Sequence, residues 1–198
     1  MQPRWYFAAT LTALPGSALA HSPMPGIGEF YGGMLHPVLV LSHLLALLVF
    51  ALLVGQRGVR AMQLTYPPFV LALCIGLFIA GFERQPALPN ETLLLALAML
   101  LGLLVAAQRP PPEGLLSILG AALALLVGMD SGVPDLPRRE TFAALLGCWL
   151  GATLLLVMVA GVTEMAQRNW QRIVVRVAGS WTTASAVLVL ALALRPVA

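Results

Sequence analysis

The chain has 198 residues, of which 60% are apolar and 10% charged, and its mean hydropathy is +0.91. Soluble domains carry about 25% charged residues, so this composition excludes an ordinary soluble domain and predicts an integral membrane protein. The formal net charge is +3, and the basic residues are all arginines that stand singly or in pairs between apolar runs. No basic stripe with interleaved aromatic residues occurs in the sequence, so we do not expect nucleic-acid binding.

Residues 1–20 predict a cleavable signal peptide. Arg4 supplies the positive start, a short apolar stretch follows it, and the Ala-Leu-Ala sequence at residues 18–20 fits the small-x-small cleavage rule. An uncleaved additional span is the alternative interpretation. Cleavage makes His21 the mature N-terminus, on the outer face of the membrane. There its amine and imidazole either chelate a metal ion together or remain simply exposed.

Six apolar runs follow the signal peptide, separated by segments rich in proline, glycine and charged residues. At about 1.5 Å per residue the first run, residues 36–55, reaches roughly 30 Å, the hydrocarbon thickness of a bilayer. We expect residues 56–60 to form a basic loop, and Pro67 and Pro68 to open the second helix. For residues 21–198 the sequence therefore predicts an all-α bundle of six transmembrane helices, over residues 36–55, 67–82, 92–107, 115–129, 141–162 and 173–194.

Small residues are expected to pack these helices together. Gly147 and Gly151 form a GxxxG pair in the fifth run, and residues 76/80 and 124/128 form further pairs of small residues four positions apart. Such pairs allow two helix backbones to approach closely, and they occur in many membrane bundles. They therefore predict packing and carry no information about function.

The arginines predict the orientation of the chain in the membrane. With the mature N-terminus outside, the inner loops hold six arginines and the outer segments hold four, in agreement with the positive-inside rule. We therefore expect a multi-pass protein of the bacterial inner membrane with a periplasmic N-terminus. The inner arginines are then Arg57, Arg60, Arg109, Arg168, Arg172 and Arg176, and the outer ones are Arg84, Arg138, Arg139 and Arg195.

Three polar side chains, His36, Ser42 and His43, lie at the start of the first apolar run. Polar groups in a membrane helix should face the protein interior or a water-filled cavity. Seven residues are almost two helical turns, so the histidines share one face, about 10.5 Å apart along the axis of a straight helix. At this separation the two histidines are not expected to bind one ion together. They would instead bind a crossing ion one after the other, with His36 near the outer surface and His43 deeper in the membrane. In a purely structural alternative, His36 caps the helix beside Pro37, and His43 bonds a backbone carbonyl.

The segment G-x-L-H-P-x(4)-S-H-L-L-A at residues 33–46, after a signal peptide and an early outer histidine, resembles the HupE/UreJ family of nickel and cobalt permeases. That family has Asp-His where this chain has Ser42-His43. For the family's second histidine-rich motif, the nearest counterpart here is Gly-Met-Asp-Ser-Gly at residues 128–132, which has no histidine. The resemblance implies metal-binding roles for His36, His43 and Ser42, and secondary ones for Asp130 and His21.

The resemblance implies a secondary permease for a divalent cation, nickel first and cobalt next, and imidazole suits nickel. The alternative is a non-transporting membrane accessory protein for metalloenzyme maturation or for a membrane complex, which the missing histidine motif favours. We expect no enzyme, because neighbouring helix residues such as Ser42 and His43 point about 100° apart and the sequence has no HExxH motif. No tightly bound cofactor is expected. The expected partners are membrane lipid, the metal cation, and either further copies of the chain or a maturation partner.

Overall fold

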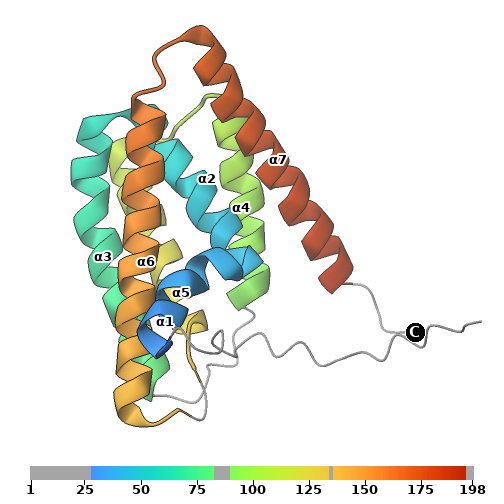
Figure 1. The fold of residues 1–198 in the computed structure, drawn as a ribbon. Coiled ribbons are helices and arrows are strands. Elements are labelled where there is room, and N and C mark those ends of the chain that lie inside the picture. Colours follow the sequence, from blue (N-terminus) through green and yellow to red (C-terminus); the bar gives the residue numbers. More distant parts are fainter. Residues whose placement is uncertain (1–27, 83–89, 134–135, 195–198) are drawn as a thin grey trace, which may run out of the picture.

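The computed structural model describes residues 28–82, 90–133 and 136–194, and the regular secondary structure in these ranges is entirely α-helical (Figure 1). The predicted signal peptide and His21 lie outside the described residues. The helices are α1 (Gly28–Leu39), α2 (Leu41–Arg57), α3 (Val59–Phe82), α4 (Asn90–Ala106), α5 (Glu113–Asp130), α6 (Arg138–Glu164) and α7 (Asn169–Ala193).

Four helices, α3, α5, α6 and α7, are long and apolar enough to cross a membrane. Helices α1 and α2 pass the same test only as a pair, and they are bent by 70° relative to each other. Helix α4 is apolar but has 17 residues, which is somewhat short for a bilayer. The described residues therefore form a helical membrane protein, as predicted. A total of six spans requires that the bent pair counts as one span and that α4 crosses as well.

The prediction of one straight helix over residues 36–55 is wrong. The backbone is extended at Val40, with φ −84° and ψ 113°, and this residue separates α1 from α2. Pro37 lies in α1 and has no N–H to donate to the carbonyl of Gly33, so the hydrogen-bond ladder is already weakened before the break. Helix α1 also begins at Gly28, eight residues before the first predicted span.

The predicted loop at residues 56–60 is reduced to a single residue. Gly58 has φ +95°, a backbone conformation that favours glycine, and α3 begins directly after it. Pro67 and Pro68 therefore lie inside α3 instead of opening it. Pro68 cannot donate to the carbonyl of Leu64, and the Ser117 hydroxyl of α5 donates to that carbonyl instead, at 3.1 Å. This substitute hydrogen bond helps α3 to continue through the prolines.

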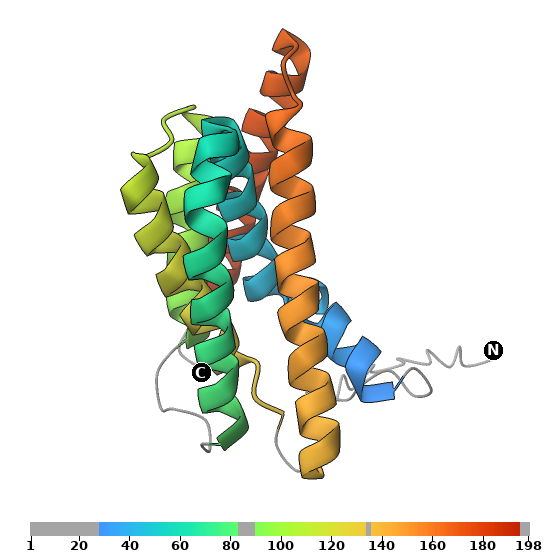
Figure 2. The ribbon, with the colours of Figure 1, turned by 90° about the vertical axis from the view of Figure 1, so that its left-hand side faces the viewer.

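Helix α2 lies at the centre of the bundle, where twelve of its 17 residues are buried. It contacts the other helices, most extensively α6 and α4. Around it, α3 packs along α5 and α4 packs along α7. Helix α1 crosses the outer side of α6 at a steep angle, as Figures 1 and 2 show. The bend at Val40 thus directs α1 out of the bundle while α2 enters its core.

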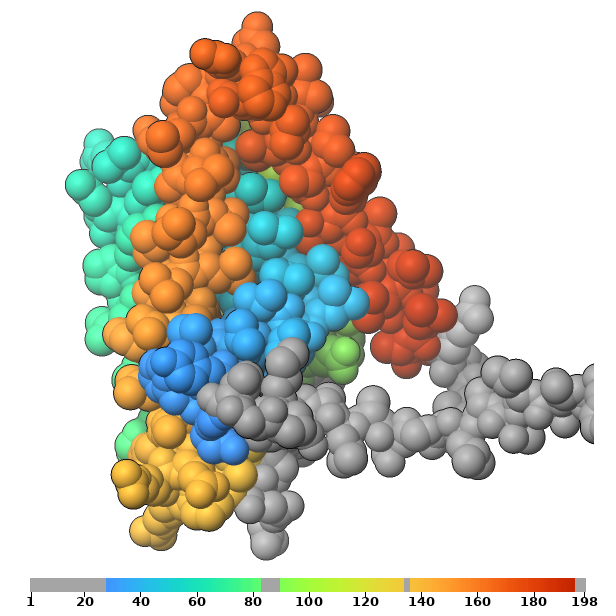
Figure 3. All heavy atoms as spheres, viewed as in Figure 1, coloured from blue at the N-terminus to red at the C-terminus, as the bar shows by residue number. Residues whose placement is uncertain are grey.

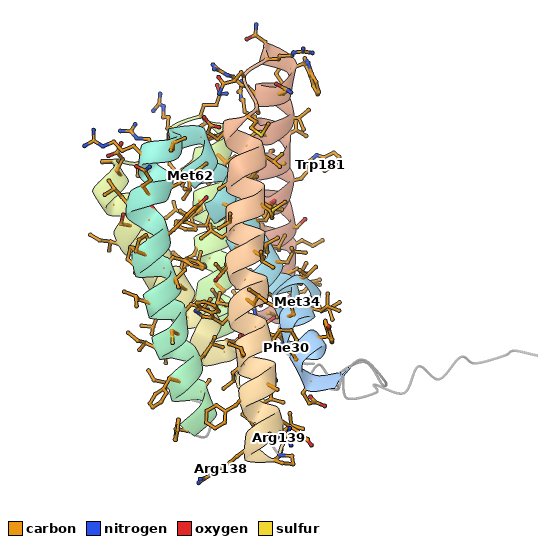
Figure 4. The ribbon with its side chains drawn as sticks, turned by 60° about the vertical axis from the view of Figure 1, so that its left-hand side comes forward. Phe30, Met34, Met62, Arg138, Arg139 and Trp181 are labelled. Carbon is orange, nitrogen blue, oxygen red and sulfur yellow. The ribbon has the colours of Figure 1, made fainter. Side chains whose placement is uncertain are left out.

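Small residues make the closest helix contacts, as the sequence predicts. A Cβ atom at Gly147 would collide with the carbonyl of Phe30, and one at Gly151 would collide with the carbonyl of Met34. Phe30 and Met34 belong to α1, which lies against α6 in Figure 4. The GxxxG pair therefore allows the backbone of α1 to pack directly on α6, and this packing fixes the position of the residues that precede the bend.

Charge divides the two ends of the bundle. We call one the arginine-rich end, because it carries six arginines and two glutamates among the described residues. The other, the acidic end, carries Glu29, Glu91, Asp130 and Glu140 with Arg138 and Arg139. Figure 4 shows Arg138 and Arg139 at the acidic end and a group of nitrogen-tipped side chains at the opposite end. The arginine-rich end carries Arg57, Arg60, Arg109, Arg168, Arg172 and Arg176 with Glu113 and Glu164.

Candidate functional site

The bend between α1 and α2 brings His36 and His43 side by side. His36 lies in the last turn of α1 and His43 in the first turn of α2. Their ring centroids are 5.2 Å apart, and the ring planes are inclined by 71°. A straight helix would separate the two residues by about 10.5 Å along its axis. Because the chain bends between the two residues, the long separation expected in a straight helix no longer counts against a shared ion.

His43 contacts Asp130, which lies 87 positions later in the chain, at the last residue of α5. The distance from His43 Nε2 to Asp130 Oδ2 is 2.9 Å. The His43 side chain is fully buried, whereas the Asp130 side chain is 30% exposed. A carboxylate accepts hydrogen bonds, so this contact places a proton on Nε2 and joins the start of α2 to the end of α5.

The second ring nitrogen of His43, Nδ1, is buried and has no hydrogen-bond partner among the described residues. In a neutral imidazole with its proton on Nε2, Nδ1 carries the free lone pair. Metal-binding histidines commonly donate their other N–H to a carboxylate, which fixes the tautomer and the ring orientation. The His43–Asp130 contact has this form, so Asp130 can orient His43 as well as supply negative charge.

Asn90 lies near Asp130 as well, and the sequence did not indicate it as a site residue. It begins α4, its side chain is buried, and it approaches the Asp130 carboxylate as a hydrogen-bond donor. The predicted third helix began at residue 92, which left Asn90 in the preceding loop. The one signal in the sequence is an asparagine at the start of an apolar run, which favours a helix cap more than a site.

Two further polar residues lie close to this contact. Ser42 is buried beside His43, with 3% of its surface exposed. Ser131 follows Asp130, donates its hydroxyl hydrogen to the carbonyl of Val127 at 2.7 Å, and receives a 3.4 Å hydrogen bond from the Cys148 thiol. These contacts fix the end of α5 against α6, and with it the position of the Asp130 backbone.

The histidine cluster, by which we mean His36, Ser42, His43, Asn90 and Asp130, lies at the acidic end of the bundle. Across the described ranges, no group of three or more His, Cys, Asp or Glu side chains is arranged to hold a metal ion. Contacts therefore join three of the five site residues predicted from the sequence, His36, His43 and Asp130. Ser42 is the buried chain neighbour of His43. The fifth, His21, lies outside the described residues.

Comparison with known proteins places this chain in a family. The family model described as HupE / UreJ protein matches residues 9–189. The chain is also 29% identical over 168 residues to Protein HupE of Rhizobium leguminosarum bv. viciae, an alignment that covers 84% of this chain and 86% of that protein. No solved structure gives a significant match. Because the family model spans most of the chain, including the whole histidine cluster, this protein belongs to the HupE/UreJ family.

Proposed function

We propose that this protein is a permease for a divalent transition-metal cation, with nickel as the first candidate and cobalt as the second. Membership of the HupE/UreJ family and the apolar helical bundle support this proposal. The observation that carries it is the 2.9 Å contact between His43 and Asp130, with the His36 ring beside it. Ionisable side chains are costly inside a membrane, and they commonly mark the path of an ion.

The cluster offers a passing cation a small number of suitable ligands. The Nδ1 atom of His43 and the imidazole of His36 are nitrogen donors of the kind that nickel prefers. Asp130 holds the His43 tautomer and contributes negative charge at the partly exposed edge of the cluster. Because the described residues provide no closed set of ligands, binding at this cluster should be weak and reversible, as transport requires.

The distribution of arginines supports an orientation for transport. Six arginines lie at the arginine-rich end, which the positive-inside rule assigns to the cytoplasm. We therefore place the histidine cluster at the periplasmic side of the bacterial inner membrane, where it would receive the cation first. The mature N-terminus would lie on the same side.

A layer of buried apolar residues separates the histidine cluster from the arginine-rich end in the described part of the chain. Beyond His43, the residues of α2 from Leu45 to Val54 are almost all buried and apolar. Phe50 of α2 stacks on Phe69 of α3, with ring centroids 6.1 Å apart, and both side chains are fully buried. Transport would therefore require the helices around α2 to move, so that a cation could pass this apolar layer.

Metal uptake by whole cells tests the proposal. Cells expressing the wild type, His36→Ala/His43→Ala or the control Cys74→Ser would be compared for radioactive nickel and cobalt uptake, with the signal segment intact and membrane levels matched. Cys74 is exposed on α3 and does not belong to the cluster. We expect uptake above empty vector in the wild type and the control, and none above vector in the double variant. Wild-type uptake equal to vector for both ions would contradict the proposal.

A second candidate function is a non-transporting accessory protein for metalloenzyme maturation or for a membrane complex. The observation that favours it is the absence of a group of three metal-binding side chains in the described ranges, together with Ser42 at the family's aspartate position. This function predicts that His36→Ala/His43→Ala leaves metal uptake unchanged. It also predicts that a partner protein copurifies with the wild type and is lost from the double variant.

A further inference from the structure

A polar cavity and an apolar groove meet at the arginine-rich end, far from the histidine cluster. The cavity has a volume of about 400 Å³ and lies among the C-terminus of α2, the α4–α5 connection and the α6–α7 connection. The groove, of about 620 Å³, lies between α6 and α7. Thr163, Ala166 and Val175 line both spaces, so the two are adjacent. Together they form an amphipathic site.

The polar cavity is lined by hydrogen-bonding side chains, among them Gln56, Gln108, Gln167 and Arg172. A guanidinium and several amide N–H groups are donors that suit a phosphate oxygen. Glu164 also lines the cavity and is the one carboxylate among its described lining residues. The lining thus combines one strong cationic donor with several neutral ones.

The groove is lined almost entirely by apolar side chains, including Met158, Val162, Trp170 and Val174. Figure 3 shows α6 and α7 diverging below the connection that joins them. Helix α7 packs mainly on α4, so its side facing α6 has little protein cover. Trp170 is 59% exposed at the start of α7, and tryptophan is enriched where a membrane helix meets the headgroup layer. The groove therefore lies at the depth where acyl chains begin.

Charge at this end favours a negatively charged headgroup. The described residues at this end include six arginines and two glutamates, so positive charge predominates. Arg60 is paired with Glu113 at 3.2 Å, and Arg176 donates to the carbonyl of Ala106 at 2.9 Å. Arg172 lines the cavity, and within the described ranges its guanidinium makes one hydrogen bond, a long one of 3.5 Å to the side-chain oxygen of Gln167. Basic pockets between membrane helices on the cytoplasmic side recognise anionic lipid headgroups.

We propose that this amphipathic site binds one anionic phospholipid, with its phosphate at Arg172 in the polar cavity and an acyl chain in the groove between α6 and α7. This inference concerns a different part of the molecule from the histidine cluster and does not depend on metal transport. A lipid in this position would fill the space between α6 and α7 and hold α7 against the rest of the bundle.

Lipid titration followed by native mass spectrometry tests this site. The whole chain would be expressed, and the protein would be purified from membranes in detergent and delipidated. It would then be titrated with phosphatidylglycerol or phosphatidylcholine of identical acyl chains. We expect one tightly retained phosphatidylglycerol and at least fivefold weaker retention of phosphatidylcholine. Arg172→Gln should remove that preference and Arg172→Lys should keep most of it. The control Arg57→Gln, an exposed position at the same end that does not line the cavity, should behave as wild type.

A groove-filling variant tests the acyl-chain part of the site. Val174→Trp should weaken retention of both lipids at least fivefold, and circular dichroism should show unchanged helix content. Equal retention of the two lipids by the wild type would overturn the proposal. So would an equal loss in Arg57→Gln and Arg172→Gln, which would mean attraction to surface charge in general. Unchanged lipid retention by a folded Val174→Trp variant would also overturn it.

Discussion

The His43 side chain is completely buried, and its one hydrogen bond in the described chain is to a carboxylate that is partly open to the outside. Replacing that carboxylate by an amide, in Asp130→Asn, keeps the size of the side chain and removes its charge. A charge-assisted hydrogen bond exceeds a neutral one by roughly 1–1.5 kcal/mol, so we expect the apparent affinity for nickel to fall about tenfold. The KM of nickel uptake measures this change.

Asn90→Ala supplies the comparison for that variant. Asn90 approaches the same carboxylate but leaves the His43–Asp130 contact intact when it is truncated. Its effect on the KM should therefore be smaller than that of Asp130→Asn. A KM that is unchanged in Asp130→Asn would contradict the role given to this contact.

Ser42 stands where the family resemblance has an aspartate, so Ser42→Asp tests what the missing charge does. Ser42 is buried next to His43, where the protein screens charges less than water does. A carboxylate there should attract a divalent cation and raise the affinity for nickel about tenfold, a gain of roughly 1.4 kcal/mol. Equilibrium binding of nickel to the purified protein measures this, with Ser42→Asn as the uncharged control. Equal affinity in all three proteins would contradict the prediction.

At the scale of the helices, the crossing of α1 over α6 depends on backbone contact at glycine. Gly147→Ala would place a methyl group against the carbonyl of Phe30, so α1 must shift. Overpacking of this kind costs about 1–3 kcal/mol, and we expect a lower Tm in detergent together with reduced metal uptake. Gly161→Ala is the matched control on the same helix, because a Cβ atom there meets nothing within 4 Å. The same loss of stability in both variants would contradict this account of the crossing.

Composition and apolar periodicity were sufficient to predict most of the helices. The bounds of α4 to α7 lie within four residues of the predicted runs. The bend at Val40 was missed because the apolar pattern continues through it, and only Pro37 hints at a weaker hydrogen-bond ladder. Pro67 and Pro68 predict a helix start, because proline favours first turns. Their place inside α3 depends on a hydroxyl from α5, which the local sequence cannot reveal.

The candidate site was predictable residue by residue but not as an arrangement. His36, Ser42 and His43 stand out because polar side chains are rare in an apolar run, and Asp130 stands out at the end of another. That His43 meets Asp130 across 87 positions depends on how α2 packs beside α5. Asn90 joins them only because α4 begins at the same end of the bundle.

For the whole molecule, the arginines predict which end faces the cytoplasm. In a background of Cys74→Ser and Cys148→Ser, Glu140→Cys places a thiol at the acidic end and Gln167→Cys places one at the arginine-rich end. In spheroplasts, a membrane-impermeant maleimide should label residue 140 at once. It should label residue 167 only after the membrane is lysed, because the positive-inside rule puts that end in the cytoplasm. The reverse pattern would contradict the orientation.

The central claim is that the imidazoles of His36 and His43 bind a transition-metal cation as it enters. Nickel X-ray absorption spectroscopy on the purified protein tests this most directly, because scattering from imidazole rings differs from that of oxygen ligands alone. We predict imidazole scattering in the wild type and its loss in His36→Ala/His43→Ala, with Cys74→Ser unchanged. A wild-type spectrum identical to that of the double variant would show that nickel does not bind these rings, and it would contradict the account.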